Sequence, residues 1–91
     1  MPAAEEISDQ KAQYLARKQS GAEARREKAR MEKLKREAAA LEEELVKLEE
    51  ELFGSAAADY VRAGELDARK GEVEERLMEI YEALEAADTE E

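Results

Sequence analysis

The 91-residue chain contains no cysteine and no histidine, and these two absences exclude several kinds of chemistry. Without cysteine the chain can form no disulfide and has no thiolate nucleophile. Without either residue it lacks the usual ligands of a zinc site and the usual acid–base group of enzymes. Disulfides, a Cys/His metal site, nucleophilic cysteine and histidine-assisted catalysis are therefore excluded.

Aromatic residues and long apolar runs are also scarce. Aromatic residues make up 4% of the chain and charged residues 44%, which leaves too little apolar surface for a closed globular core. No apolar run approaches the roughly 18 residues of a membrane span, and the N-terminal sequence is unlike a signal peptide. Ala, Glu, Lys, Leu and Arg dominate, which is typical of coiled coils. We therefore expect a soluble, cytoplasmic chain without membrane contacts.

The apolar residues that are present recur in alternating steps of three and four, the a/d pattern of a coiled coil. One series contains Met31, Leu34, Ala38, Leu41, Leu45, Leu48 and Leu52, and a second contains Ala63, Leu66, Lys70, Val73, Leu77, Ile80 and Leu84. Gly54 predicts a helix stop between them, and Ser55 or Asp59 can cap the next helix. We expect an all-α fold, a two-helix antiparallel coiled-coil hairpin over residues 22–91, with helices at about 22–52 and 59–86.

Charges beside the two apolar series predict the register of this hairpin. The g positions hold Glu37, Glu44 and Glu51 in the first helix and Arg62, Arg69 and Arg76 in the second. All three acids meet an arginine if facing core residues have numbers that add up to 111. The core layers would then be Leu34–Leu77, Ala38–Val73, Leu41–Lys70, Leu45–Leu66 and Leu48–Ala63. A register longer by seven residues is expected to keep only two of the three charge pairs.

Two features of this pattern leave alternatives open. Lys70 is the one polar member of the second series, and it either only costs stability or fixes the register. Residues 1–21 predict a linker or a short helix that starts near Ser8-Asp9, with a break at Ser20-Gly21. Tyr14 and Leu15 lie either in a frayed segment or folded back against the outer surface of the hairpin.

Charge is distributed very unevenly along the chain. Residues 11–36 hold ten Lys/Arg against three Glu, a net charge of +7, whereas residues 37–91 carry −14. The candidate nucleic-acid-binding residues are Arg25, Arg26, Lys28, Arg30, Lys33, Lys35 and Arg36. Spread over about 18 Å of helix, they can follow phosphates without reading bases. Alternatively, the acidic run Glu79, Glu82, Glu85 and Asp88 neutralises them.

Catalytic features are missing from the sequence. The four glycines are isolated, so no glycine-rich phosphate loop is present. The many glutamates could act as acid and base only in a pocket that shifts their pKa, and a two-helix hairpin offers none. We therefore expect no enzyme, no catalytic residue, no metal site and no cofactor within these 91 residues.

Two stretches resemble the C-terminal domain of ABC-F ATPases, the soluble, ribosome-associated branch of the ABC superfamily. They are "QKAQYLARKQSGAEARREKARMEKLKREAAALEEELVKLEEEL" and "FGSAAADYVRAGELDARKGEVEERLMEIYEALE". The segment "ADYVRAGELDARKGEVEERLMEIYEALE" is similar to the last helix of that family. Tyr14-Leu15 with its charged spacer is similar to the junction after the second ATPase domain. Tyr81 stands near the place where many members carry Trp.

The resemblance implies an antiparallel coiled-coil module of a larger ATP-binding protein that acts in translation. Its partners would be the ribosome and its RNA, or DNA, together with the ATPase domains of the parent chain. ATP and Mg²⁺ would bind only in those domains, which these residues do not include. We expect a monomer or a weak homodimer. The alternative is a structural or dimerisation coiled coil, or a protein-binding strut, with no nucleic-acid role.

Overall fold

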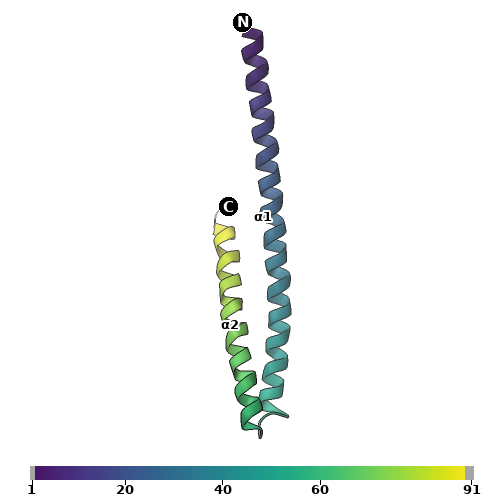
Figure 1. Cartoon of the computed structure of the whole chain (residues 1–91), viewed down its shortest axis with the longest axis vertical. Helices are drawn as coiled ribbons and strands as arrows, with labels where there is room; N and C mark the ends of the chain where they lie inside the picture. The colour runs from purple at the N-terminus through teal and green to yellow at the C-terminus, as the bar shows by residue number, and fades with distance from the viewer. Residues whose placement is uncertain (1, 90–91) are drawn as a thin grey trace. The chain divides into compact units, whose positions relative to one another are not determined.

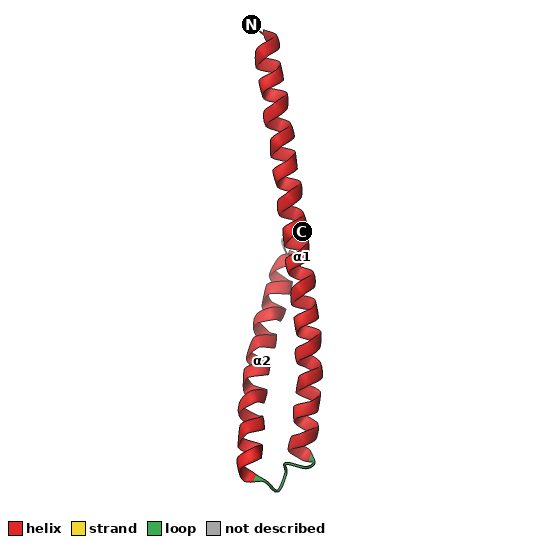
Figure 2. Cartoon of the chain, turned by 45° about the vertical axis from the view of Figure 1, so that its right-hand side comes forward, coloured by secondary structure: helices red, strands yellow, loops and turns green. Residues whose placement is uncertain are grey.

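A computed structural model gives the structure of the chain, describing the backbone of residues 2–89 and the side chains of residues 6–88. This part of the chain forms two helices, α1 (Pro2–Phe53) and α2 (Tyr60–Thr89), and contains no strand. A loop of residues 54–59 joins them, as Figure 2 shows in green. Met1–Glu32 and Lys33–Glu91 are separate units, and each is described by itself. The all-α prediction is confirmed.

The second unit is an antiparallel helical hairpin, in which α2 returns beside the part of α1 that precedes the loop (Figure 1). Val73 and Ile80 are its most deeply buried large side chains, each 1% exposed. The other buried residues are Ala38, Leu48, Ala56, Leu66 and Leu77, against which Leu34, Leu41, Leu45, Leu52 and Leu84 pack. Most of the two predicted apolar series therefore forms the core, because only a narrow stripe of each helix can face the other. Met31 and Ala63 are not among these residues, and Ala56 of the loop joins them.

Three arginines of α2 bind three glutamates of α1 along one side of this core. Arg76 and Arg69 each make two hydrogen bonds, Arg76 to Glu37 at 2.9 and 2.9 Å and Arg69 to Glu44 at 2.6 and 2.9 Å. Arg62 Nη2 donates to Glu51 Oε2 at 3.3 Å, and each arginine also pairs with the glutamate three residues later in α2. We call these contacts the Arg–Glu ladder, and all three predicted pairs are confirmed.

The core layers nevertheless differ from the predicted ones by one heptad. On the other side of the core, the Tyr81 hydroxyl donates to Glu42, and Lys70 Nζ lies 3.7 Å from Glu49 Oε1. Tyr81 and Glu42 have numbers that add up to 123. We call the number to which two facing core residues add up the core sum. With the predicted core sum of 111, Tyr81 and Glu42 would be displaced from each other by twelve residues, about 18 Å along the helices. The two side chains together cannot reach that far.

A core sum of 118 accommodates the contacts on both sides. The Arg–Glu ladder has a sum of 113 and the Tyr81–Glu42 bond a sum of 123, so both are offset by five residues, about 7.5 Å, in opposite directions. The layers are then Leu34–Leu84, Ala38–Ile80, Leu41–Leu77, Leu45–Val73, Leu48–Lys70 and Leu52–Leu66. This register also explains why Leu52, which the predicted register set opposite Asp59, packs on the core.

The prediction failed because Arg and Glu are long and flexible side chains. A g residue of α1 can meet the g residue of α2 that is displaced by two residues from the position directly opposite. By leaning along the helix, it can instead meet the g residue that is displaced by five. The same three pairs therefore fit core sums of 111 and 118. The expectation that the longer register keeps only two pairs is wrong for this reason.

Lys70 lies in the core layer with Leu48, and its charge reaches the surface. Its side chain is 28% exposed, and Nζ lies 3.7 Å from Glu49 and 3.9 Å from Glu74. The aliphatic stem thus covers the seam while the ammonium group pairs with acids at the rim. On the same side, the hydrogen bond to Glu42 raises the pKa of Tyr81, and partial burial adds to the shift.

The loop is set by a close backbone approach and a helix cap. Gly54 has no positive φ, but a Cβ there would lie 2.8 Å from the Glu50 carbonyl oxygen, so a larger residue would force the chain to shift. Asp59 Oδ1 accepts a hydrogen bond from the Arg62 amide at 3.0 Å, which is the N-cap geometry of α2. The helix stop at Gly54 and the capping role of Asp59 are thus confirmed.

In the first unit, α1 begins at Pro2 and continues through Ser20 and Gly21, so the predicted break is wrong. Glycine inside a helix costs only about 1 kcal/mol relative to alanine, and the flanking Ala, Arg, Lys and Glu residues favour the helix. Proline at the first helical position is well tolerated. Tyr14 and Leu15 are both exposed, and a fold-back that covers them would have required the break.

The register predicts which engineered cysteine pairs form a disulfide. Because the chain has no native cysteine, a Leu41→Cys/Leu77→Cys variant should oxidise to a single intramolecular bond. A Leu34→Cys/Leu77→Cys variant should stay reduced, since its positions are offset by seven residues, about 10 Å. Thiol titration after mild oxidation distinguishes the two. If the Leu34→Cys/Leu77→Cys variant oxidised preferentially, the register with a core sum of 111 would be the correct one.

The Arg–Glu ladder also predicts a dependence of stability on pH. Hydrogen bonds from Arg76 and Arg69 hold the pKa values of Glu37 and Glu44 below 4.5. Their contribution to stability is therefore complete above about pH 4.5 and is lost as the pH falls through the lowered pKa values. At about pH 7, a Glu37→Gln/Glu44→Gln variant should melt at a lower temperature than the parent chain, and the difference should vanish in acid.

Circular dichroism melts across the acidic range measure this difference. The matched control is Glu82→Gln/Glu85→Gln, which makes the same charge change at exposed outer positions of α2. The control should not lower the melting temperature near neutral pH. A ladder variant that remained less stable than the parent chain after all carboxylates are protonated would show that packing, and not charge, explains its effect.

Candidate nucleic-acid interface

The basic residues from Arg25 to Arg36, which we call the basic block, lie on α1 outside the apolar seam. None of the seven falls at an a or d position of the heptad that contains Met31 and Leu34. All seven are exposed, as expected for long cationic side chains on the solvent side of a helix. Their helix persists because Ala, Arg, Lys and Glu all favour helix formation.

Four members of the basic block belong to the first unit. Arg30 binds Glu27 through two hydrogen bonds, at 2.9 Å from Nη2 and 3.2 Å from Nε. These bonds lower the pKa of Glu27, so this pair is largely charge-neutral. Within residues 6–32, no ion pair engages Arg25, Arg26 or Lys28. These three cations are therefore the ones in this unit best placed to meet an external anion.

Arg25 lies back along α1 toward Gly21. A Cβ at Gly21 would stand 3.4 Å from Arg25 Nη1, so the guanidinium group lies over the space that the glycine leaves. A larger residue at this position would press on the guanidinium, which can yield because it ends a flexible side chain. The glycine that was predicted to break the helix instead provides room beside a candidate phosphate ligand.

The other three members, Lys33, Lys35 and Arg36, belong to the hairpin unit and are exposed. The lowered pKa of Glu37 is due mainly to its hydrogen bond with Arg76, and the charge of Lys33 adds to it. Lys33 and Arg36 occupy outer positions c and f of the heptad, pointing away from α2. The hairpin thus also presents cations to solvent near the start of its first helix.

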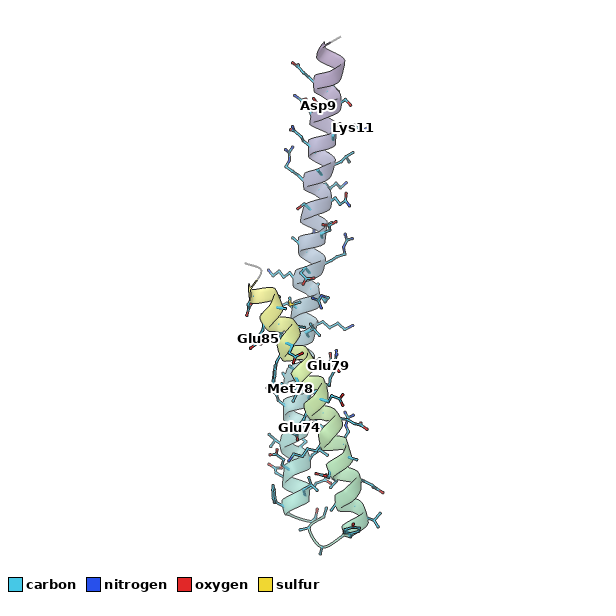
Figure 3. The ribbon with its side chains drawn as sticks, turned by 90° about the vertical axis from the view of Figure 1, so that its left-hand side faces the viewer. Asp9, Lys11, Glu74, Met78, Glu79 and Glu85 are labelled. Carbon is cyan, nitrogen blue, oxygen red and sulfur yellow. The ribbon has the colours of Figure 1, made fainter. Side chains whose placement is uncertain are left out.

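The acidic run of α2 was expected as an alternative partner for these cations. Glu79 binds Arg76 at 3.0 Å and so belongs to the Arg–Glu ladder. Glu82 and Glu85 lie level with Arg36 and Lys33 in the observed register, but both occupy outer positions of α2. Figure 3 shows Glu79 and Glu85 at the surface of that helix. Outer positions on two helices face opposite ways, so direct neutralisation of Lys33 or Arg36 by Glu82 or Glu85 is not supported.

Sequence reasoning missed two polar contacts near these residues. The Glu27–Arg30 pair has i,i+3 spacing, a helical charge pattern that the sequence alone could have revealed. The Tyr81–Glu42 hydrogen bond had no such signal, because it depends on the register of two helices. The Glu27–Arg30 pair reduces the number of cations that are open to a ligand.

Neither a metal site nor a membrane-spanning helix is found among the described residues. Among the side chains of residues 6–88, no group of three or more acidic residues is placed to hold a metal ion. Neither α1 nor α2, over its described residues, has an apolar stretch long enough to cross a membrane. Comparisons with protein families, curated proteins and solved structures give no match to the chain. The seven basic residues remain predicted, and not observed, ligands of nucleic acid.

Proposed function

We propose that the chain is a non-catalytic coiled-coil module that contacts nucleic acid through its basic block. The ligand we favour is ribosomal RNA, and DNA is the second choice. The supporting observation is that seven cations lie exposed on one helix, all outside the apolar seam. Arg25, Arg26 and Lys28 contribute nothing to the core and take part in no ion pair within residues 6–32, so their charges are the ones most open to an external anion. The resemblance to the C-terminal domain of ABC-F ATPases suggests the parent protein.

The basic block would bind phosphates and not bases. Exposed arginine and lysine on a helix neutralise phosphate charges and release the counterions that surround nucleic acid. No aromatic side chain lies between residues 22 and 36, so stacking on unpaired bases would contribute nothing. Affinity would therefore depend strongly on salt and little on sequence.

The remainder of the chain would restrict where this contact occurs. Residues 37–91 carry a net charge of −14 and would be repelled by phosphates. A helix that is basic at one end and acidic beyond it can approach a polyanion only by its basic part. In the parent protein, the ATPase domains would bind ATP and Mg²⁺, and this module would hold no cofactor itself.

Charge reversal at three residues tests the proposal. Arg25→Glu, Arg26→Glu and Lys28→Glu combined should weaken binding to purified ribosomes and to duplex RNA. The slope of log K against log salt should become shallower by about 0.7 to 0.9 for each lost phosphate contact. Helicity should be unchanged, because the three residues lie off the seam. Binding is measured by cosedimentation with ribosomes and by fluorescence anisotropy with labelled RNA across a salt series.

The matched control keeps the charge and changes the side chains. Arg25→Lys, Arg26→Lys and Lys28→Arg together should retain both the affinity and the salt slope, since dispersed phosphate contacts need charge more than shape. If the charge-reversed variant binds ribosomes, RNA and duplex DNA as well as the parent chain does, the basic block only balances acidic residues. A structural coiled coil or a protein-binding strut would then be the better interpretation.

A further inference from the structure

The closed end of the hairpin exposes large apolar side chains on both sides of its loop. Phe53 ends α1 and is 84% exposed, while Tyr60 and Val61 begin α2 and are 93% and 70% exposed. Figure 2 shows the connecting loop at this end. We call these three residues, together with loop residues 54–59, the tip. None of the three large side chains belongs to the core.

The tip holds these side chains on an ordered backbone. The Ala56 amide donates to the Glu51 carbonyl at 2.9 Å, and the Asp59 amide donates to the Ala56 carbonyl at 3.1 Å. Ala56 is 3% exposed and anchors the loop to the core. Because the loop backbone is already ordered, a partner that covers these side chains need not pay for ordering the loop.

Charge around the tip decides which partner fits. Residues 46–67 contain six acidic residues and two basic ones. The two basic residues are already paired, Lys47 with Glu43 at 3.7 Å and Arg62 with Glu51 at 3.3 Å. The apolar surface is therefore set in a negative field. Phosphate-bearing ligands and a second copy of this end would both be repelled, whereas a basic surface would be attracted.

We propose that the tip is a docking surface for a protein partner with an apolar pocket rimmed by Lys and Arg. Two aromatic side chains and one valine can bury roughly 500 Å² of the tip, which corresponds to a small, transient interface. Aromatic anchors with a charged rim are the usual composition of such contacts. The tip lies seventeen residues, about 25 Å of helix, from Arg36, so this proposal does not depend on the nucleic-acid contact.

Synthetic amphipathic peptides of about 18 residues test this chemistry. All carry the same apolar face of Leu and Phe, and their flanks are Lys, Gln or Glu. By fluorescence anisotropy, the Lys-flanked peptide should bind the parent chain at least about ten-fold more tightly than the Gln-flanked one. The Glu-flanked peptide should not bind.

Two variants locate the binding site. Phe53→Ser, Tyr60→Ser and Val61→Ser combined should weaken binding of the Lys-flanked peptide by about ten-fold or more. The control, Tyr14→Ser, Leu15→Ser and Met78→Ser, removes exposed apolar side chains elsewhere and should change it less than about two-fold. Circular dichroism should show unchanged helicity in both, because all six side chains are exposed.

Four results would overturn the proposal. Equal affinity of the tip variant and the parent chain would mean that the peptide binds acidic surface in general. Equal affinity for the Lys- and Gln-flanked peptides would remove the role of charge. Tip-dependent binding of duplex RNA or of phosphatidylglycerol vesicles would assign the surface to a different class of partner. Self-association that the tip variant abolishes, seen by sedimentation, would make a second copy the occupant.

Discussion

Burial of one narrow apolar seam between two helices is the constraint on which the hairpin depends. Each helix has apolar residues on a single stripe, and a loop of six residues leaves each stripe no other surface to face in its own unit. With the seam in place, every other heptad position is assigned to a flank or to solvent. The Arg–Glu ladder and the Tyr81–Glu42 bond follow from that assignment, as does the exposure of Lys33 and Arg36.

The seam and its flanking charges could be predicted from the sequence because they repeat every seven residues. The three ladder pairs were predicted from the repeating g positions of the two helices, the stop at Gly54 and the cap at Asp59 from local sequence, and all are confirmed. The core register could not be predicted from charge, because long side chains meet across two different offsets. The contacts Tyr81–Glu42 and Lys70–Glu49, which do not recur along the heptads, distinguish the two registers, and the packing of Leu52 agrees with them.

The start of α1 and the exposed tip illustrate two other limits of sequence reasoning. Ser20-Gly21 suggested a break, but a lone glycine costs less than its helix-favouring neighbours contribute. Phe53, Tyr60 and Val61 lie outside both apolar series, so periodicity gave them no role. The candidate cations could be placed on α1 from the sequence, and the i,i+3 spacing of Glu27 and Arg30 could also have predicted that Arg30 is paired.

The structure and the charge pattern together suggest a division of labour along the chain. We propose that cations at residues 25–36 meet phosphates, that the seam holds the two helices of the hairpin together, and that the tip, with the acidic residues around it, meets a basic protein surface. An amide-resolved NMR titration of the isotope-labelled chain with duplex RNA tests the central claim most directly. The account predicts shift changes concentrated at residues 25–36 that disappear at higher salt, with the tip unaffected. Shift changes centred on residues 53–61, or none at low salt, would contradict it.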